Sequence, residues 1–145
     1  MKIVVAFSSE KRSRLTVEIA AQHAKALNAE LILLRILPDP EKVGVVAQLI
    51  SSNMPANTAT NQIEEVVNRL RSDGVNASGL VKMGAVAKSI IQNSVELKAD
   101  MIYVGTQSIK GSQVFLMEKD PIVHYLVDNC PISLCLVRPE SNESD

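Results

Sequence analysis

A polar loop after the apolar run 101–104 carries the residues best suited to hold a ligand. It opens with Gly105 and continues with hydroxyl groups, one cation and a second glycine, namely Thr106, Ser108, Lys110, Gly111 and Ser112. Backbone N–H groups beside glycines, together with an ammonium group and hydroxyls, are groups that bind anions. Ligands of open parallel sheets bind at the carboxyl ends of the strands. These residues are therefore a candidate anion or nucleotide site, and the preferred interpretation of the loop is a solvated surface loop.

The chain shows no arrangement of side chains typical of an enzyme, and we nominate no catalytic residue. His23 and His124 have no activated serine and no well-placed aspartate beside them, so no triad is visible. We expect His23 to be a partly buried packing residue. His124, next to Tyr125, has a structural role or responds to pH near a dimer interface. Asp100, before an apolar run, is expected to orient a turn.

The segment 84–89 has a weak similarity to a phosphate-binding loop. The true motif needs a glycine directly before its lysine, and here Ala87 precedes Lys88. We expect Gly84 to make a turn and Lys88 to face solvent.

The two cysteines, Cys130 and Cys135, do not predict a metal site. Their spacing is unusual for zinc, and no second pair completes four ligands. We expect reduced, mostly structural thiols in a cytoplasmic protein.

The composition indicates one globular domain and argues against two classes of partner. The chain has 145 residues, of which 46% are hydrophobic and 3% aromatic, with a net charge of −1. The absence of a basic surplus and of aromatic stacking residues argues against nucleic acid as a partner. No apolar run approaches the length of a membrane span, so we expect no membrane partner.

Short apolar runs alternate with helical patterns along the chain. Strands are expected at 3–7, 31–37, 77–83, 101–104 and 132–137. Helices are expected at 13–27, 58–72, 86–97 and 121–128, with a further short helix at 41–50. This alternation predicts an α/β fold, an open five-stranded parallel sheet of order 3-2-1-4-5 with helices on both faces, in three layers, as in Rossmann-like nucleotide-binding domains. The order reverses between strands 1 and 4, so residues 7–9 and 105–106 border one crevice.

Single residues refine this outline. We expect Thr60 to cap the helix at 58–72, Gly74 to end it, and Gly79 to weaken the strand at 77–83. The region 51–57 is turn-rich. One domain should span residues 1–139, followed by a disordered acidic tail at 140–145.

Four segments resemble the universal stress protein family over nearly the whole chain. They are residues 2–10, 31–36, 99–106 and 130–138. The resemblance implies a five-stranded α/β fold of the adenine nucleotide alpha hydrolase-like type and a cytoplasmic dimer formed by antiparallel pairing of the last strands.

The chain departs from the nucleotide-binding motif of that family. Many members bind ATP through three glycines and a Ser or Thr after the fourth strand. Gly105 matches the first glycine, but Ser108, Glu118 and Lys119 stand at the other three positions. The aspartate that nucleotide binders tend to carry after strand 1 is replaced by Ser8. The resemblance is therefore closer to the members that do not bind ATP.

Three functions follow from these observations. The favoured one is a non-enzymatic, regulatory or protective homodimer that acts on an unknown protein partner and needs no cofactor. The alternative is a stress sensor that holds ATP or AMP, with magnesium, between Ser8 and Gly105, with Lys110 or Lys119 on the phosphates. The third is a nucleotide hydrolase or transferase on the same fold.

The last strand offers a physical reason for dimerisation. Ile132, Leu134 and Leu136 are apolar residues on a sheet edge, and unpaired edges favour pairing with another chain. Cys135 alternates with the leucines and faces the opposite side. Across a dimer axis Cys135 would approach its counterpart, and a redox switch is the alternative to a simple packing role.

Overall fold

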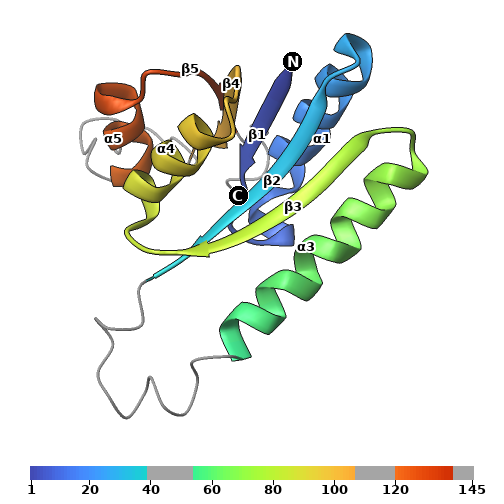
Figure 1. The fold of residues 1–145 in the computed structure, drawn as a ribbon, viewed down its shortest axis with the longest axis horizontal. Helices are drawn as coiled ribbons and strands as arrows, with labels where there is room; N and C mark the ends of the chain where they lie inside the picture. The colour runs from blue at the N-terminus through green and yellow to red at the C-terminus, as the bar shows by residue number, and fades with distance from the viewer. Residues whose placement is uncertain (39–53, 107–119, 139–145) are drawn as a thin grey trace.

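The computed structural model describes residues 1–38, 54–106 and 120–138 (Figure 1). In chain order the elements are β1 (Lys2–Ala6), α1 (Glu10–Leu27), β2 (Glu30–Leu37), α3 (Met54–Ser72), β3 (Asn76–Met83), α4 (Val86–Glu96), β4 (Met101–Gly105), α5 (Pro121–Asn129) and β5 (Ser133–Val137). The strands form one parallel sheet of order β3-β2-β1-β4-β5, which confirms the predicted topology. The predicted helix at 41–50 and the tail at 140–145 lie outside the described residues.

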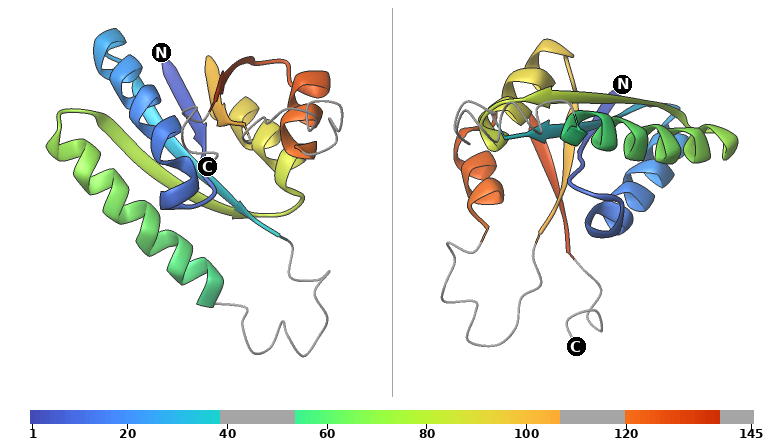
Figure 2. Two further views of the ribbon diagram at one scale, coloured as in Figure 1. Left: turned by 180° about the vertical axis from the view of Figure 1, so that it is seen from behind. Right: turned by 90° about the horizontal axis from the view of Figure 1, so that it is seen from below.

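The central strands are buried on both faces, because a helical layer covers each side of the sheet. Along β2, Leu31 and Leu33 pack into one apolar cluster, whereas Ile32 and Leu34 pack into the other. Helices α1 and α3 supply the first cluster, and α4 and α5 supply the second. Figure 2 shows these helices on opposite sides of the sheet. The continuous apolar runs of β1 and β2 are therefore the pattern expected of strands whose two faces are both buried.

Local signals explain where the helices begin and end. The Ser9 hydroxyl accepts a hydrogen bond from the Arg12 N–H at 3.1 Å, so α1 starts at Glu10, earlier than predicted. Asn28 ends α1 with φ 54°, and Gly74 follows α3 with φ 87°. The predicted cap Thr60 is wrong, because α3 begins at Met54 and Thr60 lies inside it.

Gly79 is the position at which α3 packs closely on β3. A Cβ built there would overlap the Cγ2 atom of Ile63. The glycine was expected to weaken the strand, yet β3 runs unbroken through it. Its absent side chain makes room for Ile63, which is buried in the first apolar cluster.

None of the described helices combines the length and apolarity needed to span a membrane.

Candidate functional site

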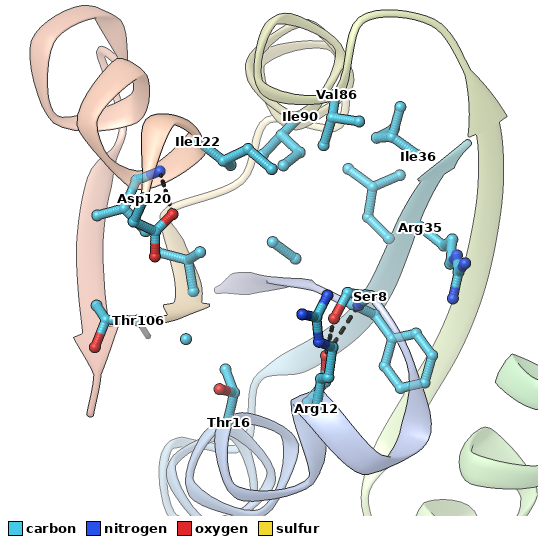
Figure 3. Close-up of a pocket in the computed structure, with 17 residues that line it drawn as sticks. Ser8, Arg12, Thr16, Arg35, Ile36, Val86, Ile90, Thr106, Asp120 and Ile122 are labelled. Carbon is cyan, nitrogen blue, oxygen red and sulfur yellow. Dashed lines mark hydrogen bonds between the residues drawn. The ribbon is translucent and has the colours of Figure 1, made fainter. Parts of the chain in front are cut away.

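A cavity of about 400 Å³ opens at the carboxyl edge of the sheet, where the strand order reverses (Figure 3). The ends of β1, β2 and β4 border it together with α1, α4 and α5. Its lining comprises Ala6, Phe7, Ser8, Arg12, Ser13, Thr16, Leu34, Arg35, Ile36, Val86, Ile90, Val104, Gly105, Thr106, Asp120, Ile122 and Val123. This is the place where open α/β sheets bind their ligands.

The wall formed by β1 and α1 is polar. The Ser8 N–H donates to the Ser13 hydroxyl at 2.9 Å, and the two hydroxyls lie 3.2 Å apart. These contacts fix the turn from β1 into α1. The Arg12 side chain rises from the first turn of α1 beside Ser8 and extends into the cavity (Figure 3). The positive end of the helix dipole and the guanidinium both favour an anion at this wall.

Arg35 adds a second positive charge near the end of β2. Its Nη1 atom is buried and has no hydrogen-bond partner among the described residues. Burial lowers the pKa of the Arg35 guanidinium from its ordinary value, because desolvation disfavours the charged form. Guanidinium groups nevertheless stay protonated in proteins. An unmatched buried N–H donor costs free energy, which an anionic or carbonyl acceptor in the cavity would recover.

The opposite wall of the cavity is aliphatic. It is formed by Ile36, Val86, Ile90 and Ile122, which come from β2, α4 and α5 (Figure 3). Asp120 lies at its rim, where the carboxylate accepts a hydrogen bond from the Val123 N–H at 3.2 Å and so caps α5. A ligand that fits the cavity therefore has one flat or apolar part and one anionic part.

Packing against α1 explains why residue 105 is a glycine, independently of any ligand. A Cβ at Gly105 would lie 2.7 Å from the Thr16 hydroxyl oxygen. Thr16 is buried on α1 and also lines the cavity. The glycine thus allows α1 to approach the end of β4. The next residue, Thr106, donates its N–H to the Val137 carbonyl at 2.9 Å and continues the sheet toward β5.

The structure brings together three of the residues predicted to bind a ligand. Ser8, Gly105 and Thr106 all line the cavity, at the carboxyl ends of β1 and β4, which are far apart in sequence. The other four, Ser108, Lys110, Gly111 and Ser112, lie outside the described residues, as do Glu118 and Lys119. The role of these seven residues as a binding site stays a prediction.

Sequence reasoning missed five polar residues of the cavity, namely Arg12, Ser13, Thr16, Arg35 and Asp120. Arg35 had a readable signal, since it is the only charged residue in the otherwise apolar run 31–37, which Pro38 follows. Arg12 and Thr16 had none, because their positions depend on how α1 packs against β4.

The histidines lie outside the cavity. His23 is exposed, so the expectation of partial burial is wrong, although its Nδ1 is hydrogen-bonded to the hydroxyl of Tyr103 and the rings meet edge to face. Tyr103 is 3% exposed. Burial, and to a lesser extent the neighbouring Cys135, raises the pKa of Tyr103. The expected turn role of Asp100 is consistent with its Oδ2, which accepts the Lys2 N–H at 2.8 Å. Lys88 is exposed, as predicted.

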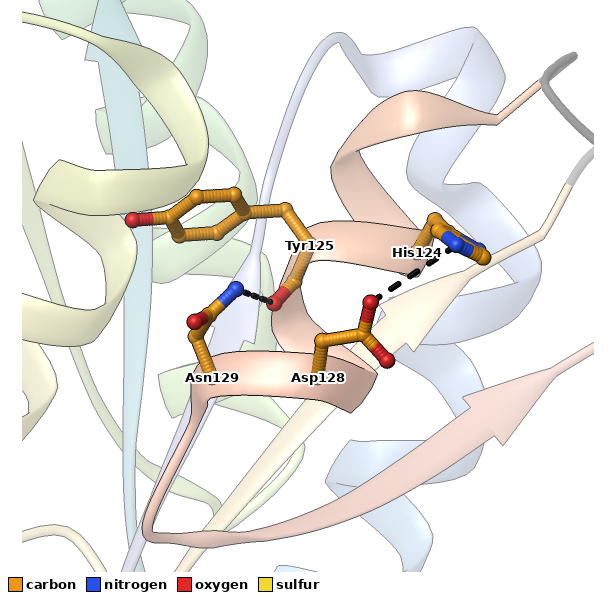
Figure 4. A network of polar contacts seen from close by, with 4 residues as sticks. All are labelled: His124, Tyr125, Asp128 and Asn129. Carbon is orange, nitrogen blue, oxygen red and sulfur yellow. Dashed lines mark hydrogen bonds and ion pairs between the residues drawn. The ribbon is translucent and has the colours of Figure 1, made fainter.

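His124 forms a solvent-facing contact on α5. Its Nε2 lies 3.7 Å from a carboxylate oxygen of Asp128, and its side chain is 68% exposed (Figure 4). One residue further along the helix, the Asn129 side-chain amide donates to the Tyr125 carbonyl at 3.0 Å. Within the described part of the chain, no three His, Cys, Asp or Glu residues cluster closely enough to hold a metal ion.

The fold and the cavity define an open parallel α/β protein with a crevice at the switch point of its sheet. The family model described as "Universal stress protein family" matches residues 1–138, so the chain belongs to the universal stress protein family. No curated protein sequence matches the chain significantly.

Solved structures share this fold at low sequence identity. A universal stress protein in complex with cAMP is 19% identical with a TM-score of 0.70, and the match covers 95% of this chain and 96% of that one. UspA from Lactobacillus plantarum is 16% identical with a TM-score of 0.73, covering 95% and 97%. An AMP-bound family member from Arabidopsis thaliana is 13% identical with a TM-score of 0.64, covering 100% and 95%.

Proposed function

We propose that this protein is a regulatory adenine-nucleotide binder that holds an AMP-like ligand in the crevice without turning it over. The observation that carries the proposal is the division of one cavity of about 400 Å³ into a cationic wall and an aliphatic wall. Its size suits a nucleoside with a small anionic group. The structural neighbours in complex with cAMP and with AMP support the same class of ligand.

Each of the two walls of the cavity binds a different part of the proposed ligand. The adenine ring packs between aliphatic side chains such as Ile36, Ile90 and Ile122, where the burial of a flat ring is favourable. The phosphate lies at the β1–α1 wall, where Arg12 and the hydroxyl of Ser8 supply hydrogen bonds to charged oxygens. Arg35 provides a further donor.

Isothermal titration calorimetry of AMP, ADP and ATP, each with and without magnesium, tests this function. Saturable AMP binding is expected, with Arg12→Gln weakening it by roughly tenfold because a charge-assisted hydrogen bond is lost. Arg14→Gln is the matched control, since Arg14 is exposed on the same helix outside the cavity. Absence of binding at millimolar nucleotide, or equal effects of the two substitutions, would reject the proposal.

A nucleotide-independent homodimer is the second candidate, and the open edge at β5 favours it. Leu136 is 43% exposed there, while Leu134, Cys135 and Ile132 are half-buried. Leu134 packs against the α4–α5 cluster and Cys135 against the other. Antiparallel pairing of two β5 strands would cover this edge and hydrogen-bond its free backbone groups.

Sedimentation velocity tests the dimer. Leu136→Lys should convert a dimer to a monomer, because it places two charges at the paired edge. Met83→Lys is the control, since Met83 is 45% exposed at the end of β3. A dimer that persists in Leu136→Lys would rule out the β5 interface. We place the protein in the cytoplasm, in keeping with the free thiols of Cys130 and Cys135.

A further inference from the structure

The edge of the sheet opposite β5 presents a row of backbone groups to solvent. β3 is the outermost strand on that side and pairs only with β2 among the described strands. The Gly84 N–H donates to the Leu37 carbonyl at 2.9 Å, so even-numbered residues of β3 direct their backbone groups at β2. Backbone direction alternates along a strand, and the N–H and C=O groups of Ala77, Gly79 and Val81 therefore face outward.

A groove of about 600 Å³ runs between this edge and α3. Its floor is the strand 78–81, with the exposed backbone of Gly79 at the centre. Its wall is a polar row along one side of the helix, formed by Thr60, Glu64, Asn68 and Arg71. Figure 1 shows α3 lying alongside β3 over most of its length. An open strand edge flanked by a helix is the arrangement that accepts an extended peptide by strand addition.

Two charges of opposite sign, Arg71 and Glu64, line the groove. The Arg71 Nε donates to the outward carbonyl of Ala77 at 2.8 Å, which anchors the guanidinium at the start of the edge. Its other N–H groups have no partner among the described residues. Glu64 is exposed and has no ion-pair partner within the same described ranges. The two residues are two helical turns apart, about 10 Å, which is the length of about three strand residues.

The position of α3 favours a single extended peptide over a second copy of this chain as the partner at the β3 edge. α3 packs directly over β3, since a Cβ on Gly79 would overlap Ile63. If the β3 strand of a second copy paired here, two α3 helices would stand over adjacent strands, about 5 Å apart. Packed helices need about 8–10 Å between their axes. A single extended segment carries no such helix and fits the edge.

We propose that the groove between α3 and β3 binds the extended carboxyl-terminal segment of a partner protein, antiparallel to β3. The remaining guanidinium N–H groups of Arg71 bind the terminal carboxylate of the peptide. The outward-facing backbone N–H and C=O groups of Gly79 and Val81 form hydrogen bonds with the peptide backbone. Glu64 binds a lysine or arginine three residues before the carboxylate. This surface lies on the far edge of the sheet from β5 and is separate from the nucleotide crevice.

Fluorescence polarisation with a labelled Thr-Lys-Val-Thr-Val peptide tests the groove, with the same peptide ending in a carboxamide as its comparison. The carboxylate peptide should bind roughly tenfold more tightly, because a charged hydrogen-bond pair replaces a neutral one. Arg71→Gln should remove this preference, and Arg71→Lys should keep part of it. Glu64→Gln should weaken binding only of peptides that carry the lysine.

Neighbouring residues on α3 provide matched controls. Arg69→Gln and Glu65→Gln change exposed charges of the same helix that do not line the groove, and both should bind like the unchanged protein. NMR should show the amide signals of Gly79 and Val81 shifting as peptide is added. No saturable binding at millimolar peptide, or a carboxylate preference that survives Arg71→Gln, would overturn the proposal. Self-association abolished by Arg71→Gln would assign the edge to a second copy and overturn it as well.

Discussion

The Thr16 hydroxyl oxygen on α1 stands 2.7 Å from where a Cβ of Gly105 on β4 would lie. Real Cβ atoms do not approach an oxygen so closely, so α1 and β4 can pack this tightly only because residue 105 is glycine. Thr16 is 3% exposed and cannot turn aside without disturbing the core beneath it. The floor of the crevice is therefore set by a steric match between a helix and a strand end.

Gly105→Ala should lower the free energy of unfolding by about 1–3 kcal/mol, the usual cost of overpacking. Thr16→Ala removes the conflicting oxygen, so the double variant should recover about 1 kcal/mol of that loss. Thr16→Val keeps an atom at the same place and should recover nothing. Urea denaturation of Gly105→Ala, the two single Thr16 variants, the two double variants and the unchanged protein measures the coupling, and strictly additive losses would contradict the steric explanation.

Arg35→Met should stabilise the protein while weakening AMP binding. The substitution removes a buried N–H donor that has no partner among the described residues, so the free energy of unfolding should rise by about 1 kcal/mol. Arg14→Met, on the exposed side of α1, should leave both quantities unchanged. Chemical denaturation and calorimetry on the same samples check the prediction. A destabilised Arg35→Met protein would show that the guanidinium is satisfied in the native state.

Tyr103 should make the protein less stable at alkaline pH. Its pKa is raised in the folded state by burial, so the unfolded chain loses the phenol proton first as pH rises. Its contribution is complete below the unfolded pKa of about 10 and is lost as pH rises toward the folded value.

Urea denaturation between about pH 8 and 11 should show a shallower decline for Tyr103→Phe than for the unchanged protein. Tyr125→Phe is the control, because Tyr125 is 38% exposed. Identical slopes for Tyr103→Phe and the unchanged protein would contradict the raised pKa.

Gly79→Ala should lower the free energy of unfolding by about 1–3 kcal/mol, because the new methyl group would overlap Ile63. Ser78→Ala changes the neighbouring half-buried position, whose side chain faces away from α3, and should change stability far less. Thermal unfolding followed by circular dichroism compares the two. Equal melting temperatures would show that α3 shifts to accommodate the methyl group at no cost.

The sequence predicted the sheet order because the strands are continuous apolar runs and right-handed crossovers leave few topologies. It predicted where the crevice lies, through Ser8 and Gly105, because strand ends follow from strand order. It did not predict Arg12 or Thr16 in the crevice, since helical periodicity leaves open which residue of a turn faces a strand end. His23 was misplaced because its position at the edge of the apolar stripe cannot separate a buried ring from one lying over Tyr103. The start of α3 was missed because the segment before Thr58 is rich in turn-forming residues.

The helix that overhangs β3 also limits how far the molecule can polymerise. A sheet in which both edge strands can pair with another copy could polymerise without limit, since each added copy offers a new unpaired edge to the next. Because α3 packs directly over β3, a second copy paired there would bring two α3 helices closer than packed helices lie. In the proposed dimer, antiparallel pairing through β5 would use the remaining edge of the described sheet in each copy, so growth would stop at two copies. Because α3 blocks pairing at the β3 edge, the proposed assembly would stop at a dimer instead of growing into a fibre.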